Sequence, residues 1–362
     1  MTVSLTRPPA LRSGDKVAVL SISSTVNPAE LEAGLDVLRF AGLEPVTYPS
    51  ALEQGSLRSY LAGDDKLRAG DLRAALLDPS IAGVLFAVGG YGAQRTLAEL
   101  DWTGLDQVAP KVLAGYSDVT AVLEAVAVRL GWASLFGPLS AINEDSYSLS
   151  SLLRVLMRPA DAVSMTFPRA RTVVPGVARG ITMGGTLTLL SSSLGTATSW
   201  PARGGIVLIE DVHEEDYRVD RMLTQLRRSG YLDGVAGIVA GTFTDCGPAS
   251  GIEAILTERL ADLGVPMIAW ANIGHGGQFQ TFPIGIAAEL DADARTLRLL
   301  DPPLVPLARY AEAGLRSRRH VWSAQVTPQR GQELAGRTQP GHTQPGHVAG
   351  VGQHGPRGQI AI

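Results

Sequence analysis

The first 131 residues alternate between two kinds of segment, and this alternation limits the possible folds more than any other feature of the sequence. The apolar runs span 16–23, 81–88 and 111–115, and the amphipathic segments span 28–42, 64–77 and 118–131. Continuous apolar runs are typical of strands buried on both faces of a parallel sheet. We therefore predict an α/β domain with a mostly parallel sheet and a flavodoxin-like order of strands and helices.

The second half repeats the alternation on a smaller scale. Its expected strands span 204–210, 235–241 and 266–270, and its expected helices span 217–229 and about 251–263. It closes with IGIAAELD and RTLRLL, which read as an antiparallel strand pair, so a mixed sheet is expected. The segment before it is rich in Pro, Ala and Arg and has no strong period. We predict an N-terminal domain over 1–160, a linker over 161–178 and a smaller C-terminal α/β domain over 179–312.

Charge and composition exclude several classes of protein. From Arg316 onward the chain has six Lys+Arg and one Asp+Glu, which leaves −9 on the first 315 residues of a chain with net charge −4. An acidic body argues against nucleic-acid binding. The tail over 313–362 is rich in Gly, Pro, Gln and His and is expected to be disordered. No run is long and apolar enough for a membrane helix and no secretory signal is seen, so a cytoplasmic protein is expected.

The first segment that could carry chemistry is VLAGYSDVT, over 112–120. An apolar strand ends at Gly115, and Ser117 follows where a helix begins. A serine on such a turn is exposed at the carboxyl edge of the sheet, beside the N–H groups and positive dipole of the helix. This suits a nucleophile whose attack creates an oxyanion. Serine is also a favoured helix N-cap, and geometry alone leaves both interpretations open.

The second segment is FAVGGYGAQRTL, over 86–97, in which a buried strand leads into a glycine loop and then a helix. Glycines allow positive φ angles and let the backbone approach a ligand closely. The spacing matches neither a P-loop nor a dinucleotide fingerprint. Donation of a backbone N–H to an oxyanion and binding of an anion are both compatible with it.

The third group lies in the second half. Glu210 and Asp211 are expected at the end of a strand, and His275 lies in the glycine-rich loop ANIGHGGQFQTFPIG. The chain has six histidines, and four of them lie at or beyond position 320, so a histidine base in the body must be His213 or His275. His213 lies among the acidic residues HEED and is expected to be solvated. His275 is the better placed of the two.

Together these residues supply the groups needed for acyl transfer. Ser117 could attack a carbonyl, His275 could accept its proton, and Glu210 could orient the imidazole and stabilise its cation. A neutral serine is a weak nucleophile, so an adjacent base is required.

These segments also resemble those of a known family, the LD-carboxypeptidases, which include murein tetrapeptide carboxypeptidases and microcin C immunity peptidases. GYSDVT is similar to the nucleophile segment of the family, and GGYGAQR to its glycine loop. LIEDVHEEDYRVDRML resembles the glutamate segment, and GHGGQFQTFPIG the histidine loop. Residues 60–84 are also similar to the stretch before the glycine loop, and the likeness covers roughly residues 10–305.

The resemblance implies a Ser117–His275–Glu210 triad divided between two domains. It implies an oxyanion hole formed by the backbone N–H groups of Asp118 and of the glycine loop, assigned to Gly90, with Gly89 and Tyr91 as close alternatives. It implies no metal and no cofactor. It also implies cleavage of the amide bond to a terminal D-amino acid, usually the D-alanine of a murein tetrapeptide, during recycling of peptidoglycan. Members of the family commonly form homodimers.

The sequence departs from the family pattern at three places. Val88 stands where an arginine often precedes the glycine loop, Thr186 where asparagine is frequent, and Phe282 where leucine is common. None of the three positions belongs to the implied triad. They leave the details of the substrate open.

Two alternatives remain beside a murein carboxypeptidase. One is an amidase of the same family that detoxifies a microcin C-like peptidyl nucleotide, although Gly92 and the compact second domain favour the murein type. The other is a non-catalytic α/β protein whose glycine loop binds a small anion. A dinucleotide enzyme is set aside, because no G-x-G-x-x-G follows the first strand.

Overall fold

A computed structural model describes residues 4–53, 58–139 and 146–307. The tail predicted to be disordered, 313–362, lies outside the described residues, as do four of the six histidines. The described residues up to 307 belong to one compact unit that contains two β-sheets. The predicted α/β fold, with a mostly parallel sheet followed by a mixed one, is confirmed.

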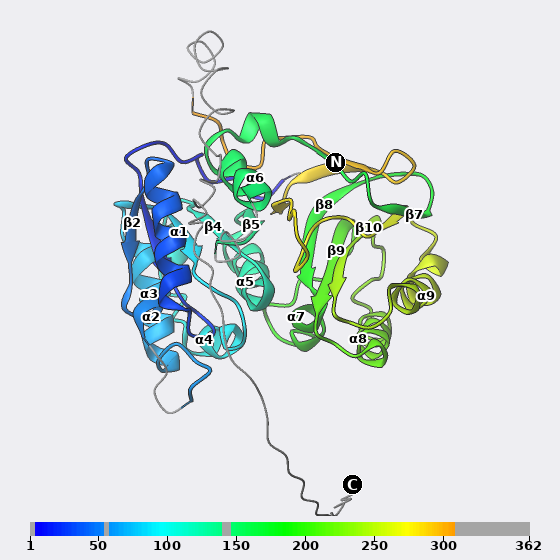
Figure 1. Cartoon of the computed structure of the whole chain (residues 1–362), viewed down its shortest axis with the longest axis horizontal. Helices are drawn as coiled ribbons and strands as arrows, with labels where there is room; N and C mark the ends of the chain where they lie inside the picture. Colours follow the sequence, from blue (N-terminus) through cyan, green and yellow to red (C-terminus); the bar gives the residue numbers. More distant parts are fainter. Residues whose placement is uncertain (1–3, 54–57, 140–145, 308–362) are drawn as a thin grey trace, which may run out of the picture. The chain divides into compact units, whose positions relative to one another are not determined.

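The first sheet has six strands in the order β12-β5-β4-β3-β1-β2 (Figure 1). Its strands are β1 (Lys16–Leu20), β2 (Glu44–Thr47), β3 (Ile81–Phe86), β4 (Val112–Gly115), β5 (Ser134–Phe136) and β12 (Phe282–Ile284). The first five are parallel to their neighbours, and β12 runs antiparallel to β5. The strands predicted from the apolar segments 16–23, 81–88 and 111–115 are all present, as β1, β3 and β4.

Helices cover both faces of this sheet. They are α1 (Pro28–Phe40), α2 (Pro49–Leu52), α3 (Asp65–Leu77), α4 (Ala93–Glu99), α5 (Thr120–Leu130) and α6 (Ser146–Met157), with short 3-10 turns η1 (Leu105–Gln107), η2 (Ser117–Val119) and η4 (Pro159–Ala162). Apolar residues of α3 and α5 pack on one face with Ala18 and Leu20, and those of α1 and α6 pack on the other with Val17 and Val19. Burial of both faces explains why the strand sequences are continuously apolar.

The second sheet has eight strands in the order β6-β14-β13-β8-β9-β10-β11-β7. They are β6 (Ser164–Thr166), β7 (Arg171–Val174), β8 (Val177–Thr186), β9 (Gly205–Val212), β10 (Gly237–Thr244), β11 (Met267–Ala269), β13 (Ala287–Asp291) and β14 (Thr296–Leu299). The central strands β8 to β11 are parallel, and the others pair antiparallel. The antiparallel pair expected at the end of the body is β13 with β14.

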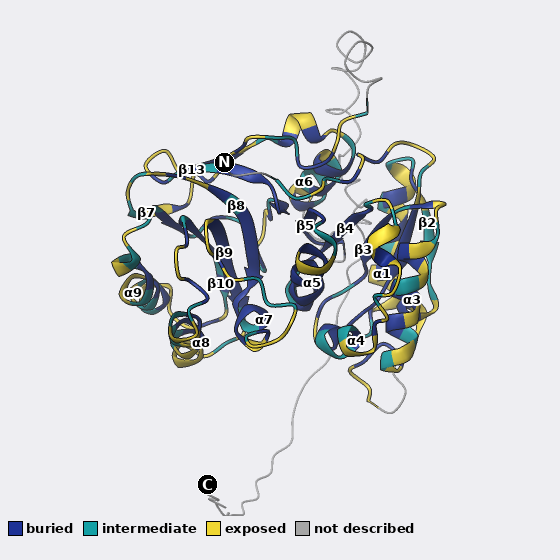
Figure 2. Ribbon diagram, turned by 180° about the vertical axis from the view of Figure 1, so that it is seen from behind, coloured by how far each residue is buried: buried dark blue, intermediate teal, exposed yellow. Residues whose placement is uncertain are grey.

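Three helices, α7 (Leu187–Ser192), α8 (Asp216–Arg228) and α9 (Ala249–Leu260), pack on one face of the second sheet, and the 3-10 turn η5 (Ala261–Leu263) follows α9. The other face contributes Leu208 and Ile286 to the same apolar cluster as Phe86 and Val122 of the first half. The central strands of both sheets are buried (Figure 2). The two halves therefore share a core.

The sequence did not reveal every element. The segment 161–178, predicted as a linker, contains β6, β7 and the start of β8, whose antiparallel partners lie more than ninety residues later in the chain. Strands β6 and β7 lie at the two edges of the second sheet and have only three and four residues, too few to give a clear periodic pattern in the sequence. The predicted domain boundaries stay a prediction.

Strand β12 links the two halves directly. It follows the histidine loop, yet it pairs with β5 of the first sheet, with Phe282 opposite Phe136. The same loop is held by α6, because the Phe279 N–H donates to Ser148 Oγ at 2.8 Å and the Thr281 N–H to Ser151 Oγ at 2.9 Å. These contacts bring the loop that carries His275 to the edge of the sheet that carries Ser117. In the described part of the chain, no helix combines the length and the apolar character needed to cross a membrane.

Candidate active site

Ser117 lies on a strained turn between β4 and α5. Its φ is +61°, in the left-handed region that residues with a side chain rarely adopt. Strand β4 ends at Gly115 and the 3-10 turn η2 begins at Ser117 itself. Strain of this kind at a single polar residue is typical of functional turns, and a serine held at a sharp strand-to-helix turn presents its hydroxyl beyond the edge of the sheet.

The alternative interpretation of Ser117 as a helix N-cap is wrong. Tyr116 occupies the N-cap position of η2, Val119 that of α5, and neither helix start is capped by a side-chain hydrogen bond. Among the described residues, Ser117 Oγ has no hydrogen-bond partner, although the residue is partly buried.

The glycine loop lies directly against Ser117. A Cβ added at Gly89 would lie 2.7 Å from Ser117 Cβ and 3.3 Å from the Asp118 nitrogen, so no side chain fits there. Gly90, with φ +100°, faces Ser24 instead, and a Cβ at this position would lie 2.2 Å from Ser24 Oγ. The loop needs glycine at both positions, at Gly89 for close approach and at Gly90 also for its backbone angle.

The backbone donors around Ser117 differ in whether they are already used. The Tyr91 N–H donates to Ser24 Oγ at 3.1 Å. Within the part of the chain that the structure describes, the N–H groups of Asp118, Gly89 and Gly90 have no acceptor. Of the three glycine-loop donors weighed from the sequence, Tyr91 is therefore occupied and the two glycines are not.

The carboxylate of Asp118 ties the turn to its surroundings. It accepts hydrogen bonds from Ser23 Oγ at 2.6 Å and from the Ala93 N–H at 2.7 Å. Burial raises the pKa of Asp118, although these donors oppose the shift. One buried side chain thus connects the serine turn with the loop after β1 and with the start of α4.

Glu210 and His275, which are 65 residues apart in sequence, form a hydrogen-bonded pair. Glu210 lies near the end of β9 with a fully buried side chain, and its Oε2 lies 2.7 Å from His275 Nδ1 and 3.2 Å from the His275 backbone nitrogen. Because an ionised carboxylate can only accept, Nδ1 carries the proton. This leaves Nε2 as the ring nitrogen that can accept a proton from another group.

The charge of Glu210 sets the proton affinity of the imidazole. Burial lowers the pKa of His275, but the charge of Glu210 and its hydrogen bond outweigh burial, so that the pKa lies above its ordinary value. The neighbouring Asp211 adds a smaller effect in the same direction. Its own pKa is raised to about 6 by burial and by the charge of Glu210. A raised pKa makes the imidazole a stronger proton acceptor, as a general base requires.

Aromatic packing brings the histidine to the serine turn. The ring of Tyr116, the residue before Ser117, lies on the ring of His275 with a distance of 5.0 Å between centroids. Tyr116 also packs edge-on against Phe136 and Phe279. Phe279 belongs to the histidine loop and Phe136 to β5, so this cluster of aromatic rings joins the three segments.

Sequence reasoning missed the residues that support these groups. Thr186 donates its hydroxyl to Glu210 Oε1 at 2.5 Å, and Thr188 donates its hydroxyl to Asp211 at 2.9 Å. Thr186 was noted only as a departure from a pattern. The one sequence feature that could have indicated its role is its position directly after two glycines, at the end of a strand.

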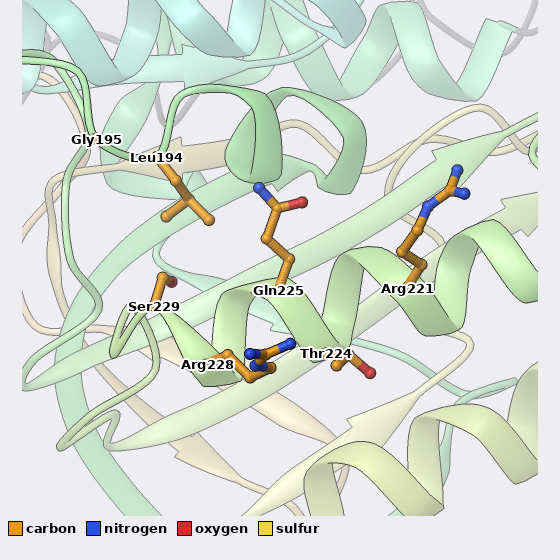
Figure 3. A pocket seen from close by; sticks show the side chains of 7 residues that line it. All are labelled: Leu194, Gly195, Arg221, Thr224, Gln225, Arg228 and Ser229. Atoms are coloured by element: carbon orange, nitrogen blue, oxygen red, sulfur yellow. The ribbon is translucent and has the colours of Figure 1, made fainter.

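Other groups weighed from the sequence lie elsewhere. His213 is exposed and pairs with Asp245 at 3.2 Å. A cavity of about 470 Å³ lies along α8 (Figure 3), and the seven residues that line it include Arg221, Gln225 and Arg228 but none of Ser117, Glu210 and His275. In the described ranges, no group of three or more His, Cys, Asp and Glu side chains is arranged to hold a metal ion.

Comparison with known proteins identifies the family of the chain. Residues 17–137 match the N-terminal domain of the LD-carboxypeptidases, and residues 179–290 match their C-terminal domain. A provisionally named carboxypeptidase of Streptomyces coelicolor is 45% identical over 304 residues, which cover 83% of this chain and 98% of that protein. The murein tetrapeptide carboxypeptidase of Pseudomonas aeruginosa is 32% identical over 298 residues, which cover 77% and 94%.

Among solved structures, the microcin C7 self-immunity protein is similar in fold. Its TM-score is 0.75 at 21% identity, and the match covers 83% of this chain and all of that one. The two domain matches and the two relatives extend over nearly the whole described part of the chain. The chain therefore belongs to the LD-carboxypeptidase family.

Proposed function

We propose that the protein is a serine carboxypeptidase that hydrolyses the L,D amide bond to the terminal D-alanine of a murein tetrapeptide. The observation that carries this proposal is the bond between Glu210 and His275 Nδ1, which leaves Nε2 as the proton acceptor beside the Tyr116–Ser117 turn. The named substrate of the Pseudomonas aeruginosa relative supports the choice of tetrapeptide. The likeness to the microcin protein concerns the fold alone, at 21% identity.

In the first half of the proposed reaction, Ser117 Oγ attacks the carbonyl carbon of the scissile amide and its proton passes to His275 Nε2. The carbonyl oxygen becomes an oxyanion, which the N–H groups of Asp118 and Gly90 stabilise. Glu210 stabilises the imidazolium that forms. Collapse of the tetrahedral intermediate breaks the C–N bond, and the leaving amine of D-alanine takes the proton from His275.

In the second half, water hydrolyses the acyl-enzyme. His275 Nε2 accepts a proton from the water while its oxygen attacks the ester carbon, and the same oxyanion donors act again. When the second intermediate collapses, Ser117 regains its proton from His275 and the tripeptide leaves with a new carboxylate. The balance requires one water and no cofactor.

The test is incubation of the purified protein with murein tripeptide, tetrapeptide and pentapeptide, followed by mass spectrometry. We expect loss of D-alanine from the tetrapeptide alone. Ser117→Ala should remove this activity by a factor of at least about 10³ without a change in the unfolding midpoint. Full turnover by Ser117→Ala would overturn the mechanism, and cleavage of a peptidyl nucleotide in place of the tetrapeptide would overturn the substrate.

A further inference from the structure

Thr186 lies between Glu210 and the helix α5, which follows Ser117. It is the last residue of β8 and stands opposite Glu210 in the register with β9. Its residue surface is 3% exposed, and Glu210 is fully buried. A polar side chain in this position must find a partner within the protein.

Two hydrogen bonds define the position of Thr186. Its Oγ1 donates to Glu210 Oε1 at 2.5 Å, on the carboxylate oxygen that His275 does not use. Its backbone N–H donates to Thr120 Oγ1 at 3.1 Å. Thr120 is the first residue of α5, three positions after Ser117, and a Cβ at Gly185 would lie only 2.7 Å from the same Oγ1. Thr186 therefore contacts the helix of the serine with its backbone and the glutamate with its side chain.

We propose that Thr186 is a positioning residue, which holds the Glu210 carboxylate in a fixed place relative to the helix that carries Ser117. The carboxylate has two oxygens and, in this site, one partner residue for each: His275 at Oε2 and Thr186 at Oε1. Without the Thr186 hydroxyl, Oε1 would lose its donor in a buried place, and the carboxylate would keep its Oε2 contacts with His275 but lose its tie to β8. The inference rests on the proposed function for its kinetic readout.

The chain offers a matched control two residues later. Thr188 donates its hydroxyl to Asp211 Oδ2 at 2.9 Å, so the same pairing of threonine and carboxylate occurs one residue along β9. Thr188→Val removes a partly buried donor from the neighbouring carboxylate of Asp211 and leaves the Glu210 contacts in place. A purely structural role of Thr186 predicts that Thr186→Val and Thr188→Val behave alike in the reaction.

The experiment compares Thr186→Val, Thr186→Ser and Thr188→Val with the wild-type protein, in kcat, KM and the pH profile of kcat/KM on the tetrapeptide. For Thr186→Val we expect kcat to fall about tenfold at unchanged KM. Without its donor, the carboxylate interacts more strongly with the imidazolium, so the acid limb of the profile should move up by roughly 0.5–1 pH unit. Thr186→Ser should restore both values, and Thr188→Val, which acts on His275 only through the smaller effect of Asp211, should move the limb by less than Thr186→Val.

An NMR titration of the His275 ring separates this inference from the proposed function, because it needs no substrate. Asp211 on β9, Tyr116 against the His275 ring, and Cys246 and Glu214 nearby are further ionisable groups around the pair, and none of them is replaced in Thr186→Val. We expect a higher pKa for His275 in Thr186→Val than in the wild-type protein. An unchanged His275 pKa and an unchanged acid limb in a folded Thr186→Val protein would overturn the inference. If the wild-type protein does not cleave the tetrapeptide but the His275 pKa is still higher in Thr186→Val, only the proposed function is overturned.

Discussion

The backbone of Ser117 is the most strained single feature of the site. A non-glycine residue in the left-handed region costs about 1–2 kcal/mol relative to ordinary backbone. At Ser117 the φ of +61° persists because β4 and α5 fix the chain on both sides. The Ser117 side chain lies beside the glycine loop, since a Cβ at Gly89 would be 3.0 Å from its Oγ.

We predict that Ser117→Gly unfolds at a higher temperature than Ser117→Ala, by the equivalent of about 1 kcal/mol. Both variants lose the hydroxyl and should be inactive, but only glycine relieves the strain at positive φ. Differential scanning calorimetry of the two variants measures the difference. Equal unfolding temperatures would mean that the turn is relaxed and that its φ has no energetic cost.

At the scale of single elements, the histidine loop is shaped by its glycines. Gly274 has φ +115°, and a Cβ there would lie 2.3 Å from Glu210 Oε2. Gly241, on β10, would meet the Ile273 carbonyl oxygen at 2.3 Å. These two positions let the loop backbone approach Glu210 closely enough for both its N–H and the His275 ring to donate to one oxygen.

We predict that Gly274→Ala lowers the free energy of unfolding by about 2–4 kcal/mol and removes most of the activity, because the new methyl group displaces the Glu210 carboxylate. Gly277 in the same loop is the control, since a Cβ there meets nothing within 4 Å. Gly277→Ala should change stability by less than about 0.5 kcal/mol. Urea unfolding and tetrapeptide turnover of both variants test this, and similar losses in the two would contradict the contact-based explanation.

At the scale of the whole molecule, α5 connects the two halves through a buried acid. Glu124 on α5 accepts a hydrogen bond from Tyr231 Oη at 3.4 Å, and its other oxygen has no partner in the described part of the chain. Burial raises the pKa of Glu124 to about 8, against the weaker opposing effect of polar groups of Trp200, Tyr231 and Ser193. The acid is therefore mostly neutral in the folded protein at pH 7.

This shift makes stability depend on pH in a definite direction. Between the unfolded pKa of about 4.5 and the folded pKa of about 8, the folded protein holds a proton that the unfolded chain releases. The contribution of Glu124 to the free energy of unfolding is therefore fully present below the unfolded pKa. It falls by up to about 1.4 kcal/mol per pH unit as the pH rises towards the folded pKa.

We predict that Glu124→Gln, which cannot ionise, unfolds with a shallower dependence on pH between 6 and 8 than the wild-type protein. Glu99→Gln, at an exposed position of α4, is the control and should keep the wild-type slope. Thermal unfolding of the wild-type protein and the two variants at several pH values gives the pH dependence of stability for each. A wild-type slope in Glu124→Gln would show that the buried acid does not control the stability of the shared core.

Much of the fold could be predicted because its elements have strong local patterns. Strands such as β1 and β3 are buried on both faces, and α1 begins with Asn27 capping the Ala29 N–H at 2.8 Å and Pro28 in the first turn. The edge strands β6 and β7 and the pairing of β12 with β5 could not be predicted, because their partners lie far away in sequence. The segment 161–178 read as a linker for this reason.

The sequence by itself determined which residues are available for chemistry, since few histidines lie in the body of the chain and Ser117, Glu210 and His275 each follow a recognisable strand or loop pattern. Only the tertiary structure decided how they are oriented. Register places Thr186 opposite Glu210, β12 carries the histidine loop to the first sheet, and the backbone strain at Ser117 exists only between β4 and α5. Local propensities depend on neighbours in the chain, whereas these contacts depend on packing between segments that are 24 to 150 residues apart.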